Sequence, residues 1–273
     1  MGVLNVTPDS FSDGGRFLDP GAAVAHGLSM ATAGADIVDV GGESSRPGAQ
    51  PVPEAEELAR VIPVIEALAP HVRVSVDTAK SAVAEAAVAA GATVLNDISA
   101  SLWPVAAHAR VGYVAMHMRG TPATMQDDPH YEDVVAEVFG FLRRRADEAR
   151  EAGVEDLWID PGIGFGKTAA HNLSLLRHLP ELVASGFPVL VGTSRKGFLG
   201  RLAPGPDGAA AGVDDRLPGS LATAVWAMLA GASMVRVHDV AAAVQAAELV
   251  GETRLSDTAC APPVASGASK GLP

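Results

Sequence analysis

Eight short apolar segments alternate along this chain with eight stretches of helical periodicity. The apolar segments lie at residues 1–6, 36–42, 72–78, 93–98, 112–118, 156–161, 188–193 and 233–239. The helical patterns lie at residues 19–33, 53–69, 79–90, 103–109, 131–152, 172–185, 217–231 and 240–251. Strict alternation of this kind is typical of βα units that form a parallel sheet. It predicts an α/β fold, a (β/α)8 TIM barrel in a single domain, which usually takes about 250 residues.

The composition narrows the class of protein further. After about residue 254 the chain is rich in Ala, Ser, Gly and Pro, so we expect the barrel over residues 1–254 and a disordered tail over 255–273. A net charge of −12 argues against a general nucleic-acid binder. No apolar run reaches the roughly 20 residues of a membrane span, we see no signal peptide, and Cys260 is a single cysteine. We therefore expect a cytoplasmic protein without nucleic-acid or membrane partners.

Polar residues share one face of each predicted strand. In the third segment Ser75 and Asp77 alternate with valines, and in the eighth Arg236 and His238 do the same. The valines should face the helices and the polar side chains the barrel axis. The same parity directs further polar residues inward near the ends of their strands, namely Asn5, Asp39, Asn96 and Asp160. Since barrel interiors prefer Val, Ile and Leu, so many polar groups at the carboxyl end require a ligand, or one another, to offset the cost of burial.

The glycine-rich segment 162–168 suggests a nucleotide-binding loop at first sight. A P-loop requires glycine where this chain has Pro161, and the dinucleotide fingerprint requires glycine where it has Lys167. Both interpretations therefore fail. The glycines instead fit a loop whose backbone approaches a flat ligand beside Asp160, with Phe165 as an apolar surface. A merely tight turn is the alternative.

Four inward polar residues at strand ends can bind a planar heterocycle. They are Asp77, Asn96, Asp160 and Lys196, which together offer acceptors, an amide and a cation. A carboxylate and an amide at fixed positions suit the amino-amidine edge of such a ring. The alternative is a buried Asp–Lys ion pair that only stabilises the barrel. Four such residues on one rim favour the ligand site.

The last strand predicts an anion site. Arg236 and His238 share a face, and in a closed barrel the eighth strand lies beside the first, which carries Asn5. An arginine, a histidine and an amide oxygen suit a phosphate group with bound Mg²⁺, and barrels often bind phosphate in this region. Ser45 and Arg46 could close over the same anion. A lone histidine is more often structural, but this grouping favours a functional role.

Two loops of Gly, Ser and Pro follow the first and second strands, at residues 7–17 and 43–50. Their position predicts that they fold over the rim as a lid. Several other polar residues have adequate explanations as loop or helix-start residues and remain unassigned: His117, Arg119, Lys167 and His171. Asp39 also remains unassigned, since a core hydrogen bond and a ligand contact are both open to it.

The strand-end motifs resemble those of one enzyme family. Residues 5–15 and 41–47 are similar to the two signature loops of dihydropteroate synthases. The later motifs match that family in order: Val76-Asp77-Thr78, Asn96-Asp97, Met116-His117-Met118, Asp160-Pro161-Gly162, Ser194-Arg195-Lys196 and Arg236-Val237-His238-Asp239. The similarity spans about residues 1–250.

The resemblance implies a reaction and a set of residue roles. The family joins 6-hydroxymethyl-7,8-dihydropterin diphosphate to 4-aminobenzoate, which yields 7,8-dihydropteroate and diphosphate for folate synthesis. Asp77, Lys196 and Arg236 would be catalytic. The pterin would be held by Asp77, Asn96, Asp160 and Lys196. The diphosphate would be held by Asn5, Ser45, Arg46, Arg236 and His238, with Asn5 as the ligand of Mg²⁺. The 4-aminobenzoate would contact Phe11, Arg46, Pro47, Phe165, Ser194 and Lys196.

Further expectations follow from the same resemblance. It implies a sulfonamide-binding site at loops one, two and seven, and a homodimer. Relatives usually carry a short N-terminal hairpin, whereas this chain starts within its first strand, so core at the lower end of the barrel could be exposed. Two other functions fit these residues less well. A methyltetrahydrofolate–corrinoid methyltransferase would have no use for Arg236 and His238, and an inactive pterin-binding paralogue should have lost some of the signature motifs.

Overall fold

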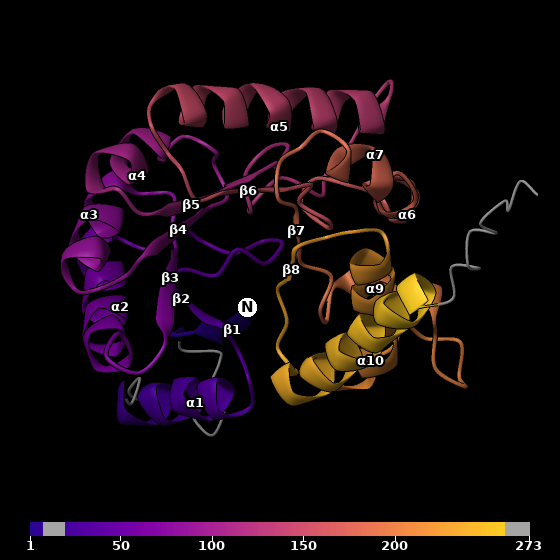
Figure 1. The fold of residues 1–273 in the computed structure, drawn as a ribbon, viewed down its shortest axis with the longest axis horizontal. Helices are drawn as coiled ribbons and strands as arrows, with labels where there is room; N and C mark the ends of the chain where they lie inside the picture. The colour runs from indigo at the N-terminus through magenta and orange to yellow at the C-terminus, as the bar shows by residue number, and fades with distance from the viewer. Residues whose placement is uncertain (8–19, 260–273) are drawn as a thin grey trace, which may run out of the picture.

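The computed structural model describes residues 1–7 and 20–259, with side chains up to residue 251. Figure 1 shows a ring of strands surrounded by helices. The strands are β1 (Gly2–Asn5), β2 (Ile37–Gly41), β3 (Arg73–Asp77), β4 (Val94–Asp97), β5 (Gly112–Met116), β6 (Leu157–Asp160), β7 (Leu190–Val191) and β8 (Met234–Val235). The helices are α1 (Pro20–Thr32), α2 (Glu54–Leu68), α3 (Ser81–Ala89), α4 (Trp103–Ala109), α5 (Val134–Glu151), α6 (Ala169–Arg177), α7 (Leu179–Val183), α8 (Gly197–Leu202), α9 (Leu217–Leu229) and α10 (Val240–Ala259), with the 3-10 helix η2 (Asp214–Arg216).

The strands close into a barrel. β1 to β6 form one parallel sheet in sequence order, and β7 pairs with β8. Parallel bridges join the two parts, from Ile159 to Val189 and from Gly2 to Val237. At the second junction the Val3 amide donates a 2.9 Å hydrogen bond to the Val237 carbonyl. The predicted (β/α)8 barrel is confirmed, and the eighth strand lies beside the first.

The main differences from the predicted elements lie in the second half of the chain. The predicted helix 172–185 is two helices, because α6 ends before His178 and α7 begins with Pro180 in its first turn. The helices α8 and η2 were not predicted, since the segment between β7 and α9 has no clear periodicity. Helix α10 runs to Ala259, past the predicted domain boundary at residue 254. The predicted first loop and most of the predicted tail lie outside the described residues.

The valines of β3 pack outward, as their alternation predicts. Val74 and Val76 are fully buried in the main core between strands and helices. A second cluster fills the inside of the barrel at its amino-terminal end: Met1, Ile37, Val94, Val114 and Leu190, with Trp158 and Met234 packed against them. This apolar plug seals one end, so the inward polar residues are left at the other end. None of the described helices is long and apolar enough to cross a membrane.

Candidate active site at the carboxyl-end rim

The strand register brings the predicted polar residues to one level of the barrel. Asn5 pairs with Gly41, Gly41 with Asp77, and Asp77 with Asn96. Paired residues of parallel strands point to the same face, so these side chains form a row on the axis side. Asp160 pairs with Met116 at the end of β6. Gly41 matters in this row because a Cβ there would lie 3.5 Å from both Asn5 Oδ1 and the Asp77 Cβ.

Arg236 lies at the centre of this row rather than apart from it. Its Nε donates a 2.6 Å hydrogen bond to Asp39 Oδ2, and its Nη2 donates a 2.8 Å hydrogen bond to Asp77 Oδ2. Asp39 is fully buried and also accepts a 3.0 Å hydrogen bond from Asn96 Nδ2. Asp39, which the sequence left unassigned, therefore orients two predicted ligand residues, the arginine and the amide.

Burial dominates the electrostatics of Asp77. It raises the pKa of this carboxyl to about 7, against the opposing charges of Arg236 and Lys196. The neighbouring charges of Asp39 and Glu57 also raise it. Asp77 therefore titrates near neutral pH in the free protein, where small changes in its surroundings alter its charge.

The loop after β6 is built on close backbone contacts. The Gly162 amide donates a 2.7 Å hydrogen bond to Asp160 Oδ1, and its φ of +62° is in the left-handed region. A Cβ on Gly162 would lie 1.9 Å from the His117 carbonyl oxygen, which no other residue could accommodate without a shift of the backbone. Glycine at position 162 therefore lets the loop pack against the end of β5.

Lys196 reaches into this loop from the start of α8. Its Nζ donates a 2.7 Å hydrogen bond to the Ile163 carbonyl and lies 3.8 Å from the centroid of the Phe165 ring. Within the part of the chain that the structure describes, no carboxylate forms an ion pair with it. The simple Asp–Lys pair considered as an alternative is therefore not what holds Lys196. Burial lowers the pKa of Lys196 to about 7, although Asp160 and Asp77 raise it.

Lys167 is a second lysine beside the same loop and, unlike the half-buried Lys196, is fully buried. Its Nζ lies within 3.0 Å of His117 Nδ1 and of the Gly162 carbonyl, and 2.9 Å from the Phe165 carbonyl. Burial lowers the pKa of His117 to about 3, so this ring is neutral and its Nδ1 can accept from the ammonium. Lys167 therefore ties the loop to the end of β5, a role that its position in the sequence did not reveal.

The segments that follow β7 and β8 meet through two pairs of polar residues. His238 Nδ1 lies 3.0 Å from Ser194 Oγ, which also accepts a hydrogen bond from the His238 amide. Arg195 donates two hydrogen bonds to Asp239, of 3.1 Å and 2.6 Å. Burial lowers the pKa of His238 to about 3, with a further contribution from Arg236, so the ring is neutral in the free protein.

The second loop extends over the rim. Ser45 is half-buried, whereas Arg46 and Pro47 are exposed. The Gly48 amide donates a 3.0 Å hydrogen bond to the Pro122 carbonyl, in the loop that follows β5. Because β2 and β5 are three strands apart, this contact brings two distant parts of the rim together. Phe11 and the rest of the first loop lie outside the described residues.

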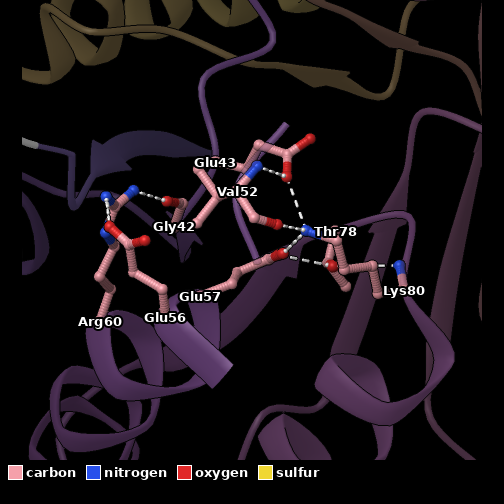
Figure 2. A network of polar contacts seen from close by, with 8 residues as sticks. All are labelled: Gly42, Glu43, Val52, Glu56, Glu57, Arg60, Thr78 and Lys80. Carbon is pink, nitrogen blue, oxygen red and sulfur yellow. Dashed lines mark hydrogen bonds and ion pairs between the residues drawn. The ribbon is translucent and has the colours of Figure 1, made fainter. Parts of the chain in front are cut away.

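A polar network at the base of this second loop was not predicted. Figure 2 shows Lys80 between Glu43, Glu57 and the Val52 carbonyl, with Thr78 beside them. The sequence did contain a signal for this network, because Glu57 falls on the apolar stripe of α2 with Val61 and Leu68. In the structure Glu57 is 1 % exposed. A carboxylate in such a stripe requires a buried partner.

The site can bind a polar planar ring, an anion and an apolar ring side by side. Asp77, Asn96 and Asp160 can bind the polar ring. Arg236 and the neutral His238 can bind the anion. Phe165, next to Lys196, can contact the apolar ring. Among the residues that the structure describes, no group of three His, Cys, Asp or Glu side chains could hold a metal ion without other ligands.

This chain is similar in sequence to proteins of known family. The profile of the family described as "Pterin binding enzyme" matches residues 1–238. The dihydropteroate synthase of Mycobacterium leprae is 50 % identical over 260 residues, which cover 92 % of each chain. That of Escherichia coli K12 is 47 % identical over 261 residues, which cover 93 % of this chain and 90 % of the relative.

The solved structures similar to this chain are of the same enzyme as its relatives in sequence. The dihydropteroate synthase of Yersinia pestis, in complex with a sulfonamide drug, superposes with a TM-score of 0.85 at 44 % identity, over 93 % of both chains. That of Xanthomonas albilineans with 4-aminobenzoic acid superposes with a TM-score of 0.85 at 49 % identity, over 93 % of this chain and 92 % of the other.

Proposed function

The chain belongs to the dihydropteroate synthase family of pterin-binding enzymes, and from this membership we propose how its rim residues divide the work of the reaction. The enzyme is a transferase of folate biosynthesis. It condenses 6-hydroxymethyl-7,8-dihydropterin diphosphate with 4-aminobenzoate to give 7,8-dihydropteroate and diphosphate. The observation that carries the assignment of roles is the contact of Arg236 with Asp77, which joins an anion-binding group to a ring-binding group.

Asp77, Asn96, Asp160 and Lys196 bind the pterin in this proposal. The carboxylates accept from the amino and ring N–H groups, and the Asn96 amide supplies both a donor and an acceptor. Lys196 donates to a ring acceptor from the side of the loop after β6, where it already contacts the Ile163 carbonyl. The pairing of Asp77 with Asn96 in the strand register supports their assignment to one ligand.

Arg236, His238, Asn5, Ser45 and Arg46 bind the diphosphate. The Arg236 guanidinium offers a fork suited to phosphate oxygens. His238 is neutral in the free protein because burial lowers its pKa to about 3, so it binds the anion first as a neutral donor. The second loop adds the Ser45 hydroxyl and the Arg46 charge from above.

Mg²⁺ fits this site as a partner of the substrate. Mg²⁺ usually keeps several waters and binds one or two protein oxygens together with substrate phosphates. Asn5 offers such an oxygen beside Gly41, where the missing side chain leaves the amide accessible. Bound there, the ion would supply positive charge to the leaving diphosphate.

The 4-aminobenzoate lies between Phe165, Lys196 and the second loop in this proposal. Phe165 supplies an apolar face, and Arg46, Pro47, Ser194 and Phe11 complete the site. The solved Xanthomonas albilineans and Thermus thermophilus enzymes contain this compound, and the Yersinia pestis enzyme contains a sulfonamide drug. We propose that sulfonamides bind this chain at the same place.

The reaction proceeds by early loss of diphosphate. The bond between the pterin methylene carbon and the diphosphate oxygen breaks, and its electron pair leaves with the diphosphate, which Arg236 and His238 stabilise. The positive charge on the methylene spreads into the pterin ring and is stabilised by the Asp77 carboxylate. The arylamine nitrogen, held in line by the loops, then attacks the carbon and releases a proton to water. No covalent intermediate with the enzyme is needed.

Assembly and location complete the proposal. We infer that the chain acts as a homodimer in the cytoplasm, as is common in its family. Trp226 and Leu229 on α9 are large apolar side chains that are partly exposed, at 39 % and 57 %, and an association would cover them favourably. Light scattering coupled to size-exclusion chromatography distinguishes one copy from two.

One assay tests the proposed chemistry. Purified full-length chain is incubated with the pterin diphosphate, 4-aminobenzoate and Mg²⁺, and dihydropteroate and diphosphate are followed together. We expect equimolar formation of both products. Tight pterin binding without product would contradict the assignment of a catalytic rim and would favour a binding paralogue.

A further inference from the structure

Both ends of the second loop are attached to one ammonium group. Lys80 Nζ donates a 2.6 Å hydrogen bond to Glu43 Oε2 at the start of the loop and a 2.7 Å hydrogen bond to the Val52 carbonyl, two residues beyond its end. The Val52 amide also donates a 2.9 Å hydrogen bond to Glu43 Oε2. These three contacts close the loop at its base (Figure 2).

The same ammonium group is held in place from beneath. Its third contact is Glu57 Oε2, on a carboxylate of α2 that is 1 % exposed. The other oxygen of Glu57 accepts a 2.7 Å hydrogen bond from Thr78 Oγ1, and Thr78 follows Asp77 directly. A continuous chain of polar contacts therefore runs from the base of the second loop to the residue beside Asp77.

The tip of the loop has much weaker support. Ser45 is half-buried and Arg46 to Gly48 are exposed. The backbone contact that joins the tip to another part of the rim, among the described residues, is the hydrogen bond from the Gly48 amide to the Pro122 carbonyl. Exposed backbone with few contacts opens easily, so the fixed base decides which region of the rim the tip can cover.

We propose that Lys80 is a positioning residue that clamps the two ends of the second loop and thereby sets Ser45 and Arg46 over the diphosphate end of the site. The inference rests on the proposed function for the role of Ser45 and Arg46. Lys80 itself does not contact the substrate in this proposal. Hydrogen bonds to Glu43 and Glu57 raise the pKa of Lys80 although burial lowers it, so the clamp stays charged at physiological pH.

The test replaces the ammonium group and compares two ligands. Lys80→Met keeps the length of the side chain and removes the charge. Because it leaves Glu57 buried without its partner, the double variant Lys80→Met/Glu57→Gln is measured beside it to preserve folding. Arg145→Met, which breaks a half-buried ion pair with Glu148 on α5, is the control.

We expect kcat/KM for the pterin diphosphate to fall at least about tenfold in both Lys80 variants, within the range that misplaced positioning groups cost. The dissociation constant of the free pterin alcohol should stay within about twofold, because neither Ser45 nor Arg46 contacts it. Hydrogen exchange should accelerate at the Gly48 and Val52 amides and stay unchanged in β3. The control should match the wild type in all three measurements.

Unchanged exchange at the Gly48 and Val52 amides would overturn the clamp. An equal loss of binding for the pterin alcohol would also overturn it, because it would indicate general damage. Arg46→Ala separates this inference from the proposed function. If Arg46→Ala impairs use of the diphosphate and the Lys80 variants do not, the clamp is wrong. If Arg46→Ala has no effect while the Lys80 variants accelerate exchange, the assignment of Arg46 is wrong and the clamp stands.

Discussion

Arg236 Nη2 donates a 2.8 Å hydrogen bond to Asp77 Oδ2, so a residue proposed for the diphosphate and one proposed for the pterin are in direct contact. Asp39 holds the same guanidinium from below through its Nε. A diphosphate that draws on Arg236 would compete with Asp77 for the same cation. In the proposed mechanism, Asp77 would then be freed from this ion pair to stabilise the positive charge on the pterin.

Asp77→Asn should reduce kcat by at least about 100-fold, in the range typical for a group that stabilises charge in the transition state. The amide keeps the shape and can still bind the ring, so affinity for the pterin alcohol should change less than kcat. Steady-state kinetics and calorimetric titration give both numbers. A kcat near that of the wild type would remove Asp77 from the catalytic residues.

Arg236→Ala should weaken binding of the pterin diphosphate far more than binding of the free pterin alcohol. The variant also leaves Asp39 fully buried without its cation, which costs up to about 3–5 kcal/mol of stability. Arg236→Lys retains the charge and is the matched control for folding. Equal losses of affinity for the two ligands would contradict the role of Arg236 at the diphosphate.

Lys196→Ala should abolish turnover and leave the fold intact. Among the described residues the side chain makes one hydrogen bond, to the Ile163 carbonyl, and contacts the Phe165 ring, so its removal breaks few interactions. Circular dichroism and a thermal melt check the fold, and the coupled product assay checks turnover. Near-normal activity would show that the ring and the aminobenzoate are held without this lysine.

The dependence of kcat/KM for the pterin diphosphate on pH should be bell-shaped with a maximum close to pH 7. Burial raises the pKa of Asp77 to about 7, so protonation below pH 7 removes the carboxylate that the ring requires. Burial lowers the pKa of Lys196 to about 7, so the ammonium is lost above pH 7. The pH profile of the residual activity of Asp77→Asn should not fall on the acidic side. The pH profile of Lys196→Arg should not fall on the basic side. A profile flat from pH 6 to 8 would contradict both.

Gly162→Ala should destabilise the protein more than Gly186→Ala. Both glycines have positive φ, and this backbone conformation alone costs an alanine about 1–2 kcal/mol. A Cβ at position 162 would lie 1.9 Å from the His117 carbonyl oxygen, whereas nothing lies within 4 Å of one at position 186. The difference between the two melting temperatures measures that clash. Equal melting temperatures would mean that the loop after β6 adapts freely.

The fold follows from local patterns in the chain. Alternation of apolar strands with helical segments predicts the barrel, and parity within β3 predicts that Val74 and Val76 face the helices while Asp77 faces the axis. These patterns depend on the periods of two and 3.6 residues that the backbone imposes. The places where prediction was wrong, the break at His178 and the helix α8, lie where local signals are weak and packing decides.

The candidate site was likewise predicted in part. Strand-end positions in the sequence predict that the polar residues meet on one rim. The contacts within that rim are known from the folded chain alone: Arg236 contacts Asp39 and Asp77, His238 contacts Ser194, and Lys80 joins Glu43 to Glu57. These contacting residues are 23 to 197 residues apart in the chain. Strand periodicity determines the face on which a side chain lies, whereas its partner depends on register, on side-chain length and on which buried charges must be neutralised together.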